Sequence, residues 1–221
     1  MKIEIKNLCK SFDKIEVIKN INVVFNSGNI YGLYGRNGSG KSVLMKLICG
    51  FLIPTSGEIL INGINFNLEK DYPKNLRAVI EKPSFFPDLT GFENLKLLAE
   101  IQNKITDDEI LKSLEIVNLL EEKDKKYSKY SLGMKQKLAI AQAIMENPQI
   151  LILDEPFNGI EEKTVNKIIE YLKEEKKEKI IIFSTHIKED LTALADKIYK
   201  IDNGRLYENW IKFNKKQNKK R

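Results

Sequence analysis

The chain has few of the residues that build metal centres and disulfide frameworks. Its 221 residues include two cysteines, one histidine and one tryptophan. Cys9 and Cys49 stand in unrelated contexts, without a Cys-x-x-Cys pair or a Cys/His cluster, so neither a zinc site nor a disulfide framework is indicated. We expect both cysteines to be small buried apolar residues of a protein in a reducing compartment.

Long hydrophobic runs are missing as well. No apolar run approaches the roughly 20 residues that a helix needs to cross a bilayer. Residues 1–6 alternate like a strand and do not resemble a signal peptide. Any action at a membrane is therefore expected from outside the bilayer or through a partner.

Basic charge is present, but it is concentrated at one end of the chain. The sequence has 37 Lys and Arg residues against 31 Asp and Glu, a formal net charge of +6. Residues 212–221 contain six basic side chains and no acid, so residues 1–211 are formally neutral. The body of the chain thus gives no reason to expect a specific nucleic-acid partner. We interpret the tail as a solvated, frayed end, with attraction to anionic lipid or RNA as the alternative.

Residues 35–42, Gly-Arg-Asn-Gly-Ser-Gly-Lys-Ser, fit the phosphate-binding loop pattern G-x-x-x-x-G-K-[ST]. An apolar run at 30–34 predicts a buried strand before the loop, and 43–48 predicts a helix after it. Glycines let successive N–H groups point at phosphate oxygens, and the helix start adds the positive end of its dipole. Lys41 is expected to reach the β- and γ-phosphates, and the Ser42 hydroxyl to bind Mg²⁺. The predicted phosphate-binding set is Gly35, Asn37, Gly38, Ser39, Gly40, Lys41, Ser42 and Val43.

A pair of acids ends another apolar run, at 150–153. Ligands of open parallel sheets lie beyond the carboxyl ends of the strands. Asp154 is therefore expected to hold Mg²⁺, through water, and Glu155 to polarise the water that attacks the γ-phosphate. Two solvated acids at a strand end are the alternative, and the phosphate-binding loop favours a shared Mg²⁺–nucleotide site.

The one histidine, His186, also follows an apolar strand, predicted at 179–183. A lone histidine is usually structural. This one is expected at the same edge of the sheet as Lys41 and Asp154, where a γ-phosphate would lie. We interpret it as a phosphate contact or as a linchpin for Glu155.

The alternation of strands and helices predicts an α/β fold with a parallel sheet. No internal repeat is present, so the chain is predicted to form one nucleotide-binding unit. Capping boxes, in which a threonine and a glutamate three residues on cap a helix start, are predicted at Thr90 and Thr106. The further expected elements are strands at 2–6, 22–25, 58–61, 77–81 and 149–153, and helices at 134–146 and 164–176.

Residues 130–138, Tyr-Ser-Leu-Gly-Met-Lys-Gln-Lys-Leu, resemble the signature motif of ATP-binding cassette (ABC) proteins, which reads LSGGQ or, in its longer variant, LSGGMKQRL. The chain has the phosphate loop, the signature, Asp-Glu-Pro and Ser-Thr-His in the same order as that family. The resemblance covers Met1 to about Leu206. The resemblance implies a single ABC ATPase domain, residues 1–221. Its parts would be a RecA-like P-loop NTPase core with N-terminal antiparallel strands (1–82 and 148–206), an inserted α-helical subdomain (83–147) and a basic tail (207–221).

The resemblance also implies roles for residues outside the phosphate loop. Phe12 stands where these proteins stack an aromatic ring on adenine, with an ordinary core phenylalanine as the alternative. Ser131 and Gly133 would contact the γ-phosphate of ATP on a second, opposed subunit, because a helix N-terminus presents N–H groups to an anion. The implied assembly is a head-to-tail pair with two ATP molecules between its protomers, in which a lone monomer hydrolyses ATP poorly.

Three departures from the family pattern bear on these roles. Leu132 replaces the first glycine of the signature and should be tolerated if its φ is negative and its side chain points away from phosphate. Glu161 replaces the usual Asp, a longer acid expected to weaken communication across the interface. Glu81 replaces a glutamine that contacts Mg²⁺, so the implied metal set is Ser42, Glu81 and Asp154. The added carboxylate would bind the metal more tightly or raise a neighbouring pKa.

Glu81, the signature and the stretch 85–95 together look like bacitracin-export and lantibiotic-immunity ATPases. The implied function is that of an ATPase subunit whose permease is a separate chain, held at the inner face of the cell membrane. In this family the region after Glu81 forms a groove for a permease helix, and Phe85 and Phe86 either line that groove or pack inside the helical subdomain. Phe92 is expected in the core.

A second class of function remains as the alternative: a non-transport ABC ATPase acting on ribosomes or DNA. The single cassette, the lack of long coiled coils and the neutral body disfavour it. A kinase or GTPase is disfavoured by the signature and by the missing Asn/Thr-Lys-x-Asp pattern.

Overall fold

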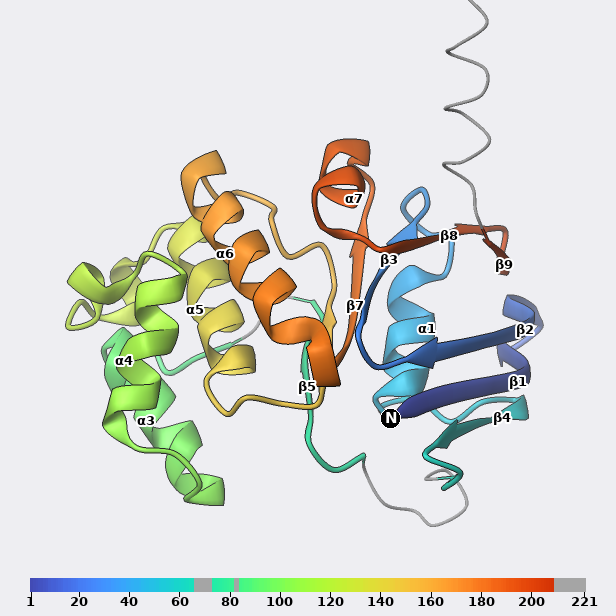
Figure 1. Ribbon diagram of the computed structural model, residues 1–221, viewed down its shortest axis with the longest axis horizontal. Helices are drawn as coiled ribbons and strands as arrows, with labels where there is room; N and C mark the ends of the chain where they lie inside the picture. The colour runs from blue at the N-terminus through green and yellow to red at the C-terminus, as the bar shows by residue number, and fades with distance from the viewer. Residues whose placement is uncertain (66–72, 82–83, 209–221) are drawn as a thin grey trace, which may run out of the picture.

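Two sheets and several helices make up the described part of the chain, which is residues 1–65, 73–81 and 84–208 of a computed structural model (Figure 1). The basic segment 212–221 lies outside these residues, as do residues 82 and 83 next to Glu81. The boundaries of the implied subdomains, at 82/83, 147/148 and 206/207, stay predictions.

The chain begins with a three-stranded antiparallel sheet. β1 (Lys2–Phe12) lies in the middle, between β2 (Ile15–Asn26) and β4 (Ser56–Ile61). The hairpin of β1 and β2 is much longer than the predicted strands at 2–6 and 22–25. Register shifts between Ile5 and Ser11 interrupt its two-residue period, so the alternation on which the prediction depended is lost there.

The larger sheet has the strand order β5-β6-β7-β3-β8-β9. Every neighbouring pair is parallel except β8 and β9, which confirms the predicted parallel sheet. Because the parallel strands end at one edge, the loops that follow β3, β6 and β7 lie together. The strands are β3 (Asn29–Tyr34), β5 (Leu76–Val79), β6 (Ile150–Leu153), β7 (Ile180–Thr185), β8 (Lys197–Asp202) and β9 (Arg205–Glu208).

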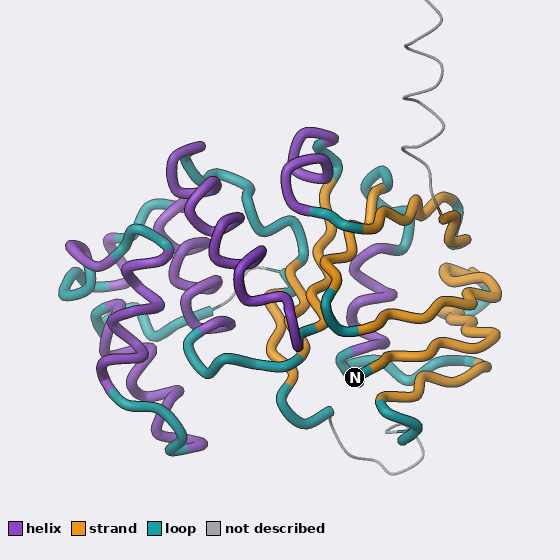
Figure 2. Tube along the Cα trace, in the orientation of Figure 1, coloured by secondary structure: helices purple, strands orange, loops and turns teal. Residues whose placement is uncertain are grey.

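Helices cover both faces of the larger sheet. Figures 1 and 2 show α1 on the side of the three-stranded sheet, and α5 and α6 on the other side with α3 and α4 beyond them. The α-helices are α1 (Lys41–Ile48), α3 (Gly91–Gln102), α4 (Asp107–Ile116), α5 (Leu132–Ile144), α6 (Glu162–Glu175) and α7 (Lys188–Leu194). Short 3₁₀ turns occur at Leu120–Glu122, Tyr127–Lys129 and Lys176–Glu178.

Alternate side chains of the central strands enter two different hydrophobic clusters. On β6, Ile150 and Ile152 pack with α1 and the small sheet, whereas Leu151 and Leu153 pack with α5 and α6. Burying one such side chain contributes roughly 1.5–3 kcal/mol. The strand that ends in the Asp154–Glu155 pair is therefore anchored from both faces.

Both predicted capping boxes are present. The Glu93 carboxylate accepts a hydrogen bond from the Thr90 N–H (2.7 Å), and the Glu109 carboxylate accepts one from the Thr106 N–H (2.6 Å). Helices α3 and α4 begin directly after these threonines. The hydrogen bonds lower the pKa of both glutamates, so ionised carboxylates favour these helix starts.

The elements after residue 187 were missed by the sequence analysis. Helix α7 is short, and β8 and β9 form an antiparallel hairpin. Asn203 and Gly204 between them have φ values of 49° and 77°. An Asn-Gly pair between two apolar runs is a strong hairpin signal, and it would have revealed these strands.

The cysteine prediction is half right. Cys49 is buried, and burial raises the pKa of its thiol to about 12. Cys9 is only partly buried, and its sulfur accepts a hydrogen bond from the N–H of Asn20 at 3.2 Å. Among the described residues no helix has the length and apolar character to cross a membrane.

Candidate nucleotide site

The phosphate-binding loop opens directly into α1. Gly40 caps the helix with φ 108°, and the N–H of Leu44 donates to the Gly40 carbonyl at 2.9 Å. A Cβ on Gly40 would lie 3.0 Å from the Ile18 side chain, and an L-residue rarely adopts this φ, so the position needs glycine. The first N–H groups of α1 precede the intrahelical bonds and are free for an anion.

A cleft of about 400 Å³ lies above this loop. It brings the loop together with the two acids that end β6, although more than 110 residues separate them along the chain. The lining residues are Val17, Asn37, Gly38, Gly40, Lys41, Ser42, Val43, Asp154 and Glu155. All of them except Val17 belong to the predicted site.

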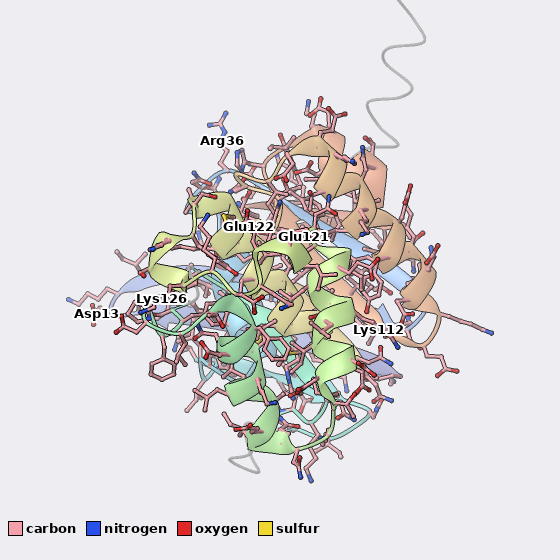
Figure 3. All side chains as sticks on the ribbon, turned by 90° about the vertical axis from the view of Figure 1, so that its left-hand side faces the viewer. Asp13, Arg36, Lys112, Glu121, Glu122 and Lys126 are labelled. Carbon is pink, nitrogen blue, oxygen red and sulfur yellow. The ribbon has the colours of Figure 1, made fainter. Side chains whose placement is uncertain are left out.

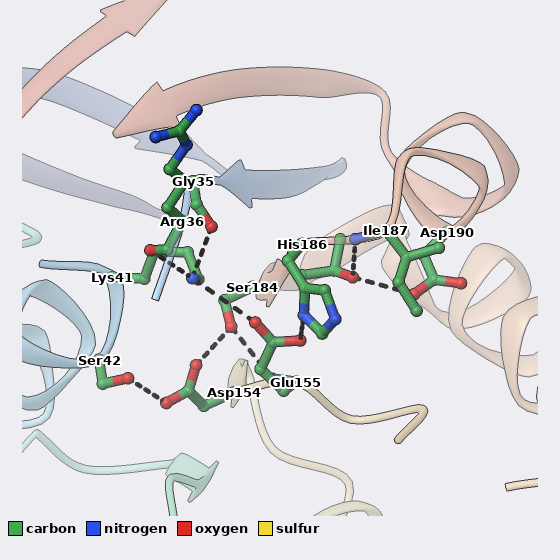
Figure 4. A network of polar contacts seen from close by, with 11 residues as sticks. Gly35, Arg36, Lys41, Ser42, Asp154, Glu155, Ser184, His186, Ile187 and Asp190 are labelled. Carbon is green, nitrogen blue, oxygen red and sulfur yellow. Dashed lines mark hydrogen bonds and ion pairs between the residues drawn. The ribbon is translucent and has the colours of Figure 1, made fainter. Parts of the chain in front are cut away.

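Lys41 is held inside the loop. Its side chain is 6% exposed, and its Nζ donates to the carbonyls of Gly35 (2.8 Å) and Arg36 (3.3 Å). Nζ also lies 3.5 Å from Oε1 of Glu155 (Figure 4). A buried ammonium group needs such acceptors, and a phosphate entering the cleft would supply stronger ones.

Asp154 is fixed by two hydroxyl groups. Its Oδ2 accepts a hydrogen bond from the Ser42 Oγ at 2.5 Å, and its Oδ1 accepts one from Ser184 (Figure 4). The Ser184 hydroxyl in turn accepts the N–H of Glu155 at 3.0 Å. Ser184 is fully buried at the end of β7, so it aligns both acids. Ser184 is not among the predicted site residues, although its place beside His186 in the Ser-Thr-His run is a signal for it.

Glu155 has a strained backbone and an anchored side chain. Its φ is 48°, a region that few residues other than glycine, asparagine and aspartate adopt. Its Oε2 lies 2.7 Å from Nδ1 of His186, while its Oε1 is buried and has no hydrogen-bond partner among the described residues. His186 does not line the cleft and reaches it through Glu155, as a linchpin would.

The loop around His186 is braced from behind. The Thr185 Oγ1 donates to Asp190 at 2.9 Å and accepts the N–H of Ile187 at 3.0 Å. Burial raises the pKa of the Asp190 carboxyl group, and the nearby charge of Glu155 adds to this effect. The backbone on both sides of the imidazole is thus held in place (Figure 4).

Glu81 stands at the same sheet edge but faces a different partner. Its carboxylate pairs with Lys46 on α1, and its side chain is 69% exposed. Val79 and Leu153 are register partners, so Glu81 and Glu155 are each the second residue beyond neighbouring strands. Among the described residues, these two are the only ones with positive φ that are not Gly, Asn or Asp.

The donor set at the cleft suits Mg²⁺. A serine hydroxyl and a carboxylate are hard oxygen ligands, the kind that this ion prefers. In the described ranges no three His, Cys, Asp or Glu side chains converge on a metal position. Ser42 and Asp154 would hold only part of the coordination shell, which fits an ion that usually keeps water and substrate phosphates as its other ligands.

The residues assigned by the family resemblance lie outside this cleft. Phe12 is 42% exposed at the end of β1, so the core alternative is wrong, and Lys10 Nζ lies 5.0 Å from the centre of its ring. Ser131 caps α5 by accepting the N–H of Met134 at 3.2 Å. Leu132 starts this helix with a negative φ and is 63% exposed, so it can face away from a phosphate.

Two of the three phenylalanines after Glu81 pack inside the molecule. Phe85 is buried edge-to-face against Tyr127 (5.2 Å between ring centres), and Phe92 packs against the helical cluster. Phe86 is 59% exposed. The core alternative therefore holds for Phe85 and not for Phe86.

A second cavity, of about 550 Å³, lies where α1, β5 and α3 meet. Its lining, within the part of the chain that the structure describes, includes three basic side chains and no acidic one. The lining residues are Cys49, Phe51, Pro73, Lys74, Asn75, Leu76, Arg77, Ala78, Gln102, Lys104 and Gln142.

Comparison with known proteins gives a family match and related chains. The family model described as ABC transporter matches residues 18–158. An uncharacterised ABC transporter ATP-binding protein of Bacillus subtilis, YybJ, is 43% identical, with 92% of this chain and 94% of that protein covered. The bacitracin transport ATP-binding protein BcrA of Enterococcus faecalis is 40% identical (93% and 68% covered). The lantibiotic transport ATP-binding protein SrtF of Streptococcus pyogenes is 34% identical (92% and 88% covered).

Solved structures of ABC proteins are similar to this chain over nearly its whole length. An ATP-binding subunit of an ABC transporter superimposes with a TM-score of 0.86 at 28% identity, covering 99% of this chain and 94% of that one. The dimeric structure of MJ0796, a bacterial ABC transporter cassette, gives a TM-score of 0.82 at 26% identity, with 93% and 98% covered.

Proposed function

The chain belongs to the ABC transporter family as an ATP-binding, ATP-hydrolysing subunit, and from that premise we propose that it powers peptide-antibiotic export through a separate permease. The substrate class is supported by the bacitracin and lantibiotic transport proteins, which are 40% and 34% identical to it. In this proposal the permease holds the chain at the inner face of the cell membrane.

The triphosphate of ATP is proposed to occupy the cleft above the phosphate-binding loop. The N–H groups at the start of α1 and the ammonium group of Lys41 would bind its oxygens. Lys41 supports this role because its charge is already buried there, beside main-chain carbonyls. The exposed ring of Phe12 would stack on the adenine.

Mg²⁺ is proposed to be held by the Ser42 hydroxyl and the Asp154 carboxylate. When bound, the ion neutralises charge that develops on the β- and γ-phosphates. The Ser184 hydroxyl keeps Asp154 pointed at Ser42. Glu81 would have to exchange its ion pair with Lys46 in order to join this metal set.

Glu155 is proposed as the general base, and its environment is the observation that carries the mechanism. One carboxylate oxygen is anchored by His186. The other is buried, has no hydrogen-bond partner within the described ranges, and lies 3.5 Å from Lys41 Nζ. An oriented carboxylate oxygen at the end of the cleft can accept a proton from the attacking water. His186 would keep Glu155 in place during this transfer.

Two copies are proposed to pair head-to-tail, with each ATP between the phosphate loop of one protomer and the signature of the other. A similar cassette has been solved as a dimer, which supports pairing. Ser131 and Gly133 open α5, and a helix start attracts an anion. Neither residue lines the cleft of its own chain, as expected if they serve the partner's nucleotide.

The permease is proposed to dock in the 550 Å³ cavity. Among the described residues, no ion pair is recorded for Lys74 or Lys104 of this cavity, whereas Arg77 is paired with Glu146. Phe51 adds an exposed aromatic surface. A short amphipathic helix with acidic residues would match both features.

Replacing Glu155 with glutamine tests the mechanism. Glu155→Gln should bind ATP normally but lower kcat about 10²- to 10⁴-fold, because the general base is lost. ATP should then accumulate in a stable dimer, which sedimentation velocity would detect. Glu162→Gln, on the exposed start of α6, is the matched control and should keep the wild-type rate.

Different outcomes of these measurements would reject different parts of the proposal. Full turnover by Glu155→Gln would remove Glu155 from its role. Cells that express this variant with its permease should lose resistance to a bacitracin- or lantibiotic-type peptide, and unchanged resistance would reject the substrate class. A pull-down with this chain should recover a membrane protein. Recovery of rRNA or DNA in its place would favour the ribosome- or DNA-directed class.

A further inference from the structure

The segment 156–161, which follows Glu155, is attached to the signature helix α5 at three points. The Gln136 side chain donates to the Pro156 carbonyl at 3.1 Å. Gly133 lies so close to Gly159 that a Cβ added to Gly133 would be 2.3 Å from the Gly159 carbonyl oxygen. The third attachment joins Lys137 to Glu161.

The Lys137–Glu161 ion pair joins a buried ammonium group to a carboxylate whose side chain is 58% exposed. The Lys137 side chain is only 8% exposed, so its charge depends on a partner. The same Glu161 oxygen accepts a hydrogen bond from the Thr164 hydroxyl at 3.1 Å, and Asn118 donates to that hydroxyl at 3.4 Å. The hydrogen bond from Lys137 lowers the pKa of Glu161, which keeps the carboxylate ionised.

Both members of this pair depart from the ABC pattern in a compensating way. The longer signature variant has arginine at the position of Lys137, and aspartate is usual at the position of Glu161. A lysine reaches less far than an arginine, and a glutamate reaches about one methylene further than an aspartate. The combined reach is therefore similar, and the expectation that Glu161 weakens communication considers only one half of the pair.

We propose that Lys137 and Glu161 are a length-matched pair of positioning residues that fixes segment 156–161 to the signature helix. This inference rests on the proposed head-to-tail pairing. Segment 156–161 continues from Glu155, which serves the chain's own ATP, whereas the start of α5 faces the ATP of the partner. The pair would then hold in register two parts of one chain that act on different nucleotides.

A double-mutant cycle that exchanges side-chain lengths tests the proposal. Glu161→Asp is too short to reach Lys137, and Lys137→Arg is too long for its enclosed position. Each single variant should lower kcat about fivefold, as expected for a coupled pair. The double variant Lys137→Arg/Glu161→Asp should recover to within about twofold of the wild type. Glu162→Asp, one residue along and exposed, is the control and should have no effect.

Two further readouts separate positioning from a merely structural role. The Kd for ATP of the monomer should stay unchanged in all variants, because Lys41 and Ser42 are untouched. Thermal midpoints should also stay within a few degrees of the wild type, whereas a kcat loss that follows lost stability would overturn the proposal. A double variant no more active than Glu161→Asp would overturn it as well. An inactive wild type would instead reject the proposed function.

Discussion

At the scale of single residues, Glu81 and Glu155 show how similar backbones can present carboxylates to different partners. Each lies two residues beyond its strand, with a φ that is unusual for glutamate. Strain of this kind costs of order 1–3 kcal/mol and persists where the surrounding structure over-determines it. Glu155 is held by His186 and Ser184, while the one recorded partner of Glu81 among the described residues is Lys46. Glu81 is thus the acid with more freedom to change partner.

Replacing Glu81 with glutamine tests whether this carboxylate reaches the metal. Glu81→Gln should raise the Mg²⁺ concentration that gives half-maximal ATPase activity about tenfold, because an anionic oxygen is lost. Lys46→Met should shift it in the opposite direction, since it frees the carboxylate. A titration of ATPase rate against Mg²⁺ measures both. An unchanged Mg²⁺ dependence in both variants would show that Glu81 has no direct metal role.

Residue types alone indicated the acids, the lysine and the histidine of the site, but not the residues that hold them. Ser184 and Lys137 lie within recognised motifs, but the contacts that give them their roles appear only when β6, β7 and α5 are brought together. For Phe85, the residue type suited a permease groove as well as the core, and the ring is buried against Tyr127. Such outcomes depend on tertiary packing, which one sequence does not specify.

At the scale of elements, local signals were reliable where the chemistry is local. The two capping boxes depend on residues three positions apart, so Thr90 and Thr106 predicted both helix starts correctly. The start of α5 was placed two residues late because Ser131, its actual cap, lacks an acid at the third position. Strands were less predictable, since the length of β1 is set by distant partners and bulges.

The cavity between α1, β5 and α3 allows a prediction about the permease. Reversing two charges there, in Lys74→Glu/Lys104→Glu, should reduce co-purification of the membrane subunit at least about tenfold, because an acidic helix would be repelled. ATPase activity of the isolated chain should not change. The control reverses Lys112, on α4, and Lys126, in the loop before the turn Tyr127–Lys129. Both are exposed and lie outside the cavity (Figure 3). Equal loss of the permease in both double variants would contradict a specific docking site.

At the scale of the whole molecule, the described chain holds a phosphate loop, two acids and a histidine in one place and a signature helix elsewhere. Lys41 lines the cleft, whereas Ser131 does not. If a single chain formed the whole ATP site, the signature helix would have no nucleotide to contact. The proposed head-to-tail pairing would give each signature the ATP of the partner, so that both halves of every site would be used. This division of the site between two chains can be tested by complementation.

Two inactive variants should restore activity when they are mixed. Lys41→Ala removes the proposed phosphate ligand. Ser131→Asp keeps a good helix cap while placing a negative charge where the partner's γ-phosphate would lie. In a mixed pair one site carries both defects and the other carries neither. Random pairing makes half of the dimers mixed, so the mixture should show about a quarter of the wild-type ATPase rate. The rate is measured over a series of mixing ratios, with each variant alone as the baseline. A mixture that forms mixed dimers but stays at that baseline would show that each chain builds its site without the partner's signature.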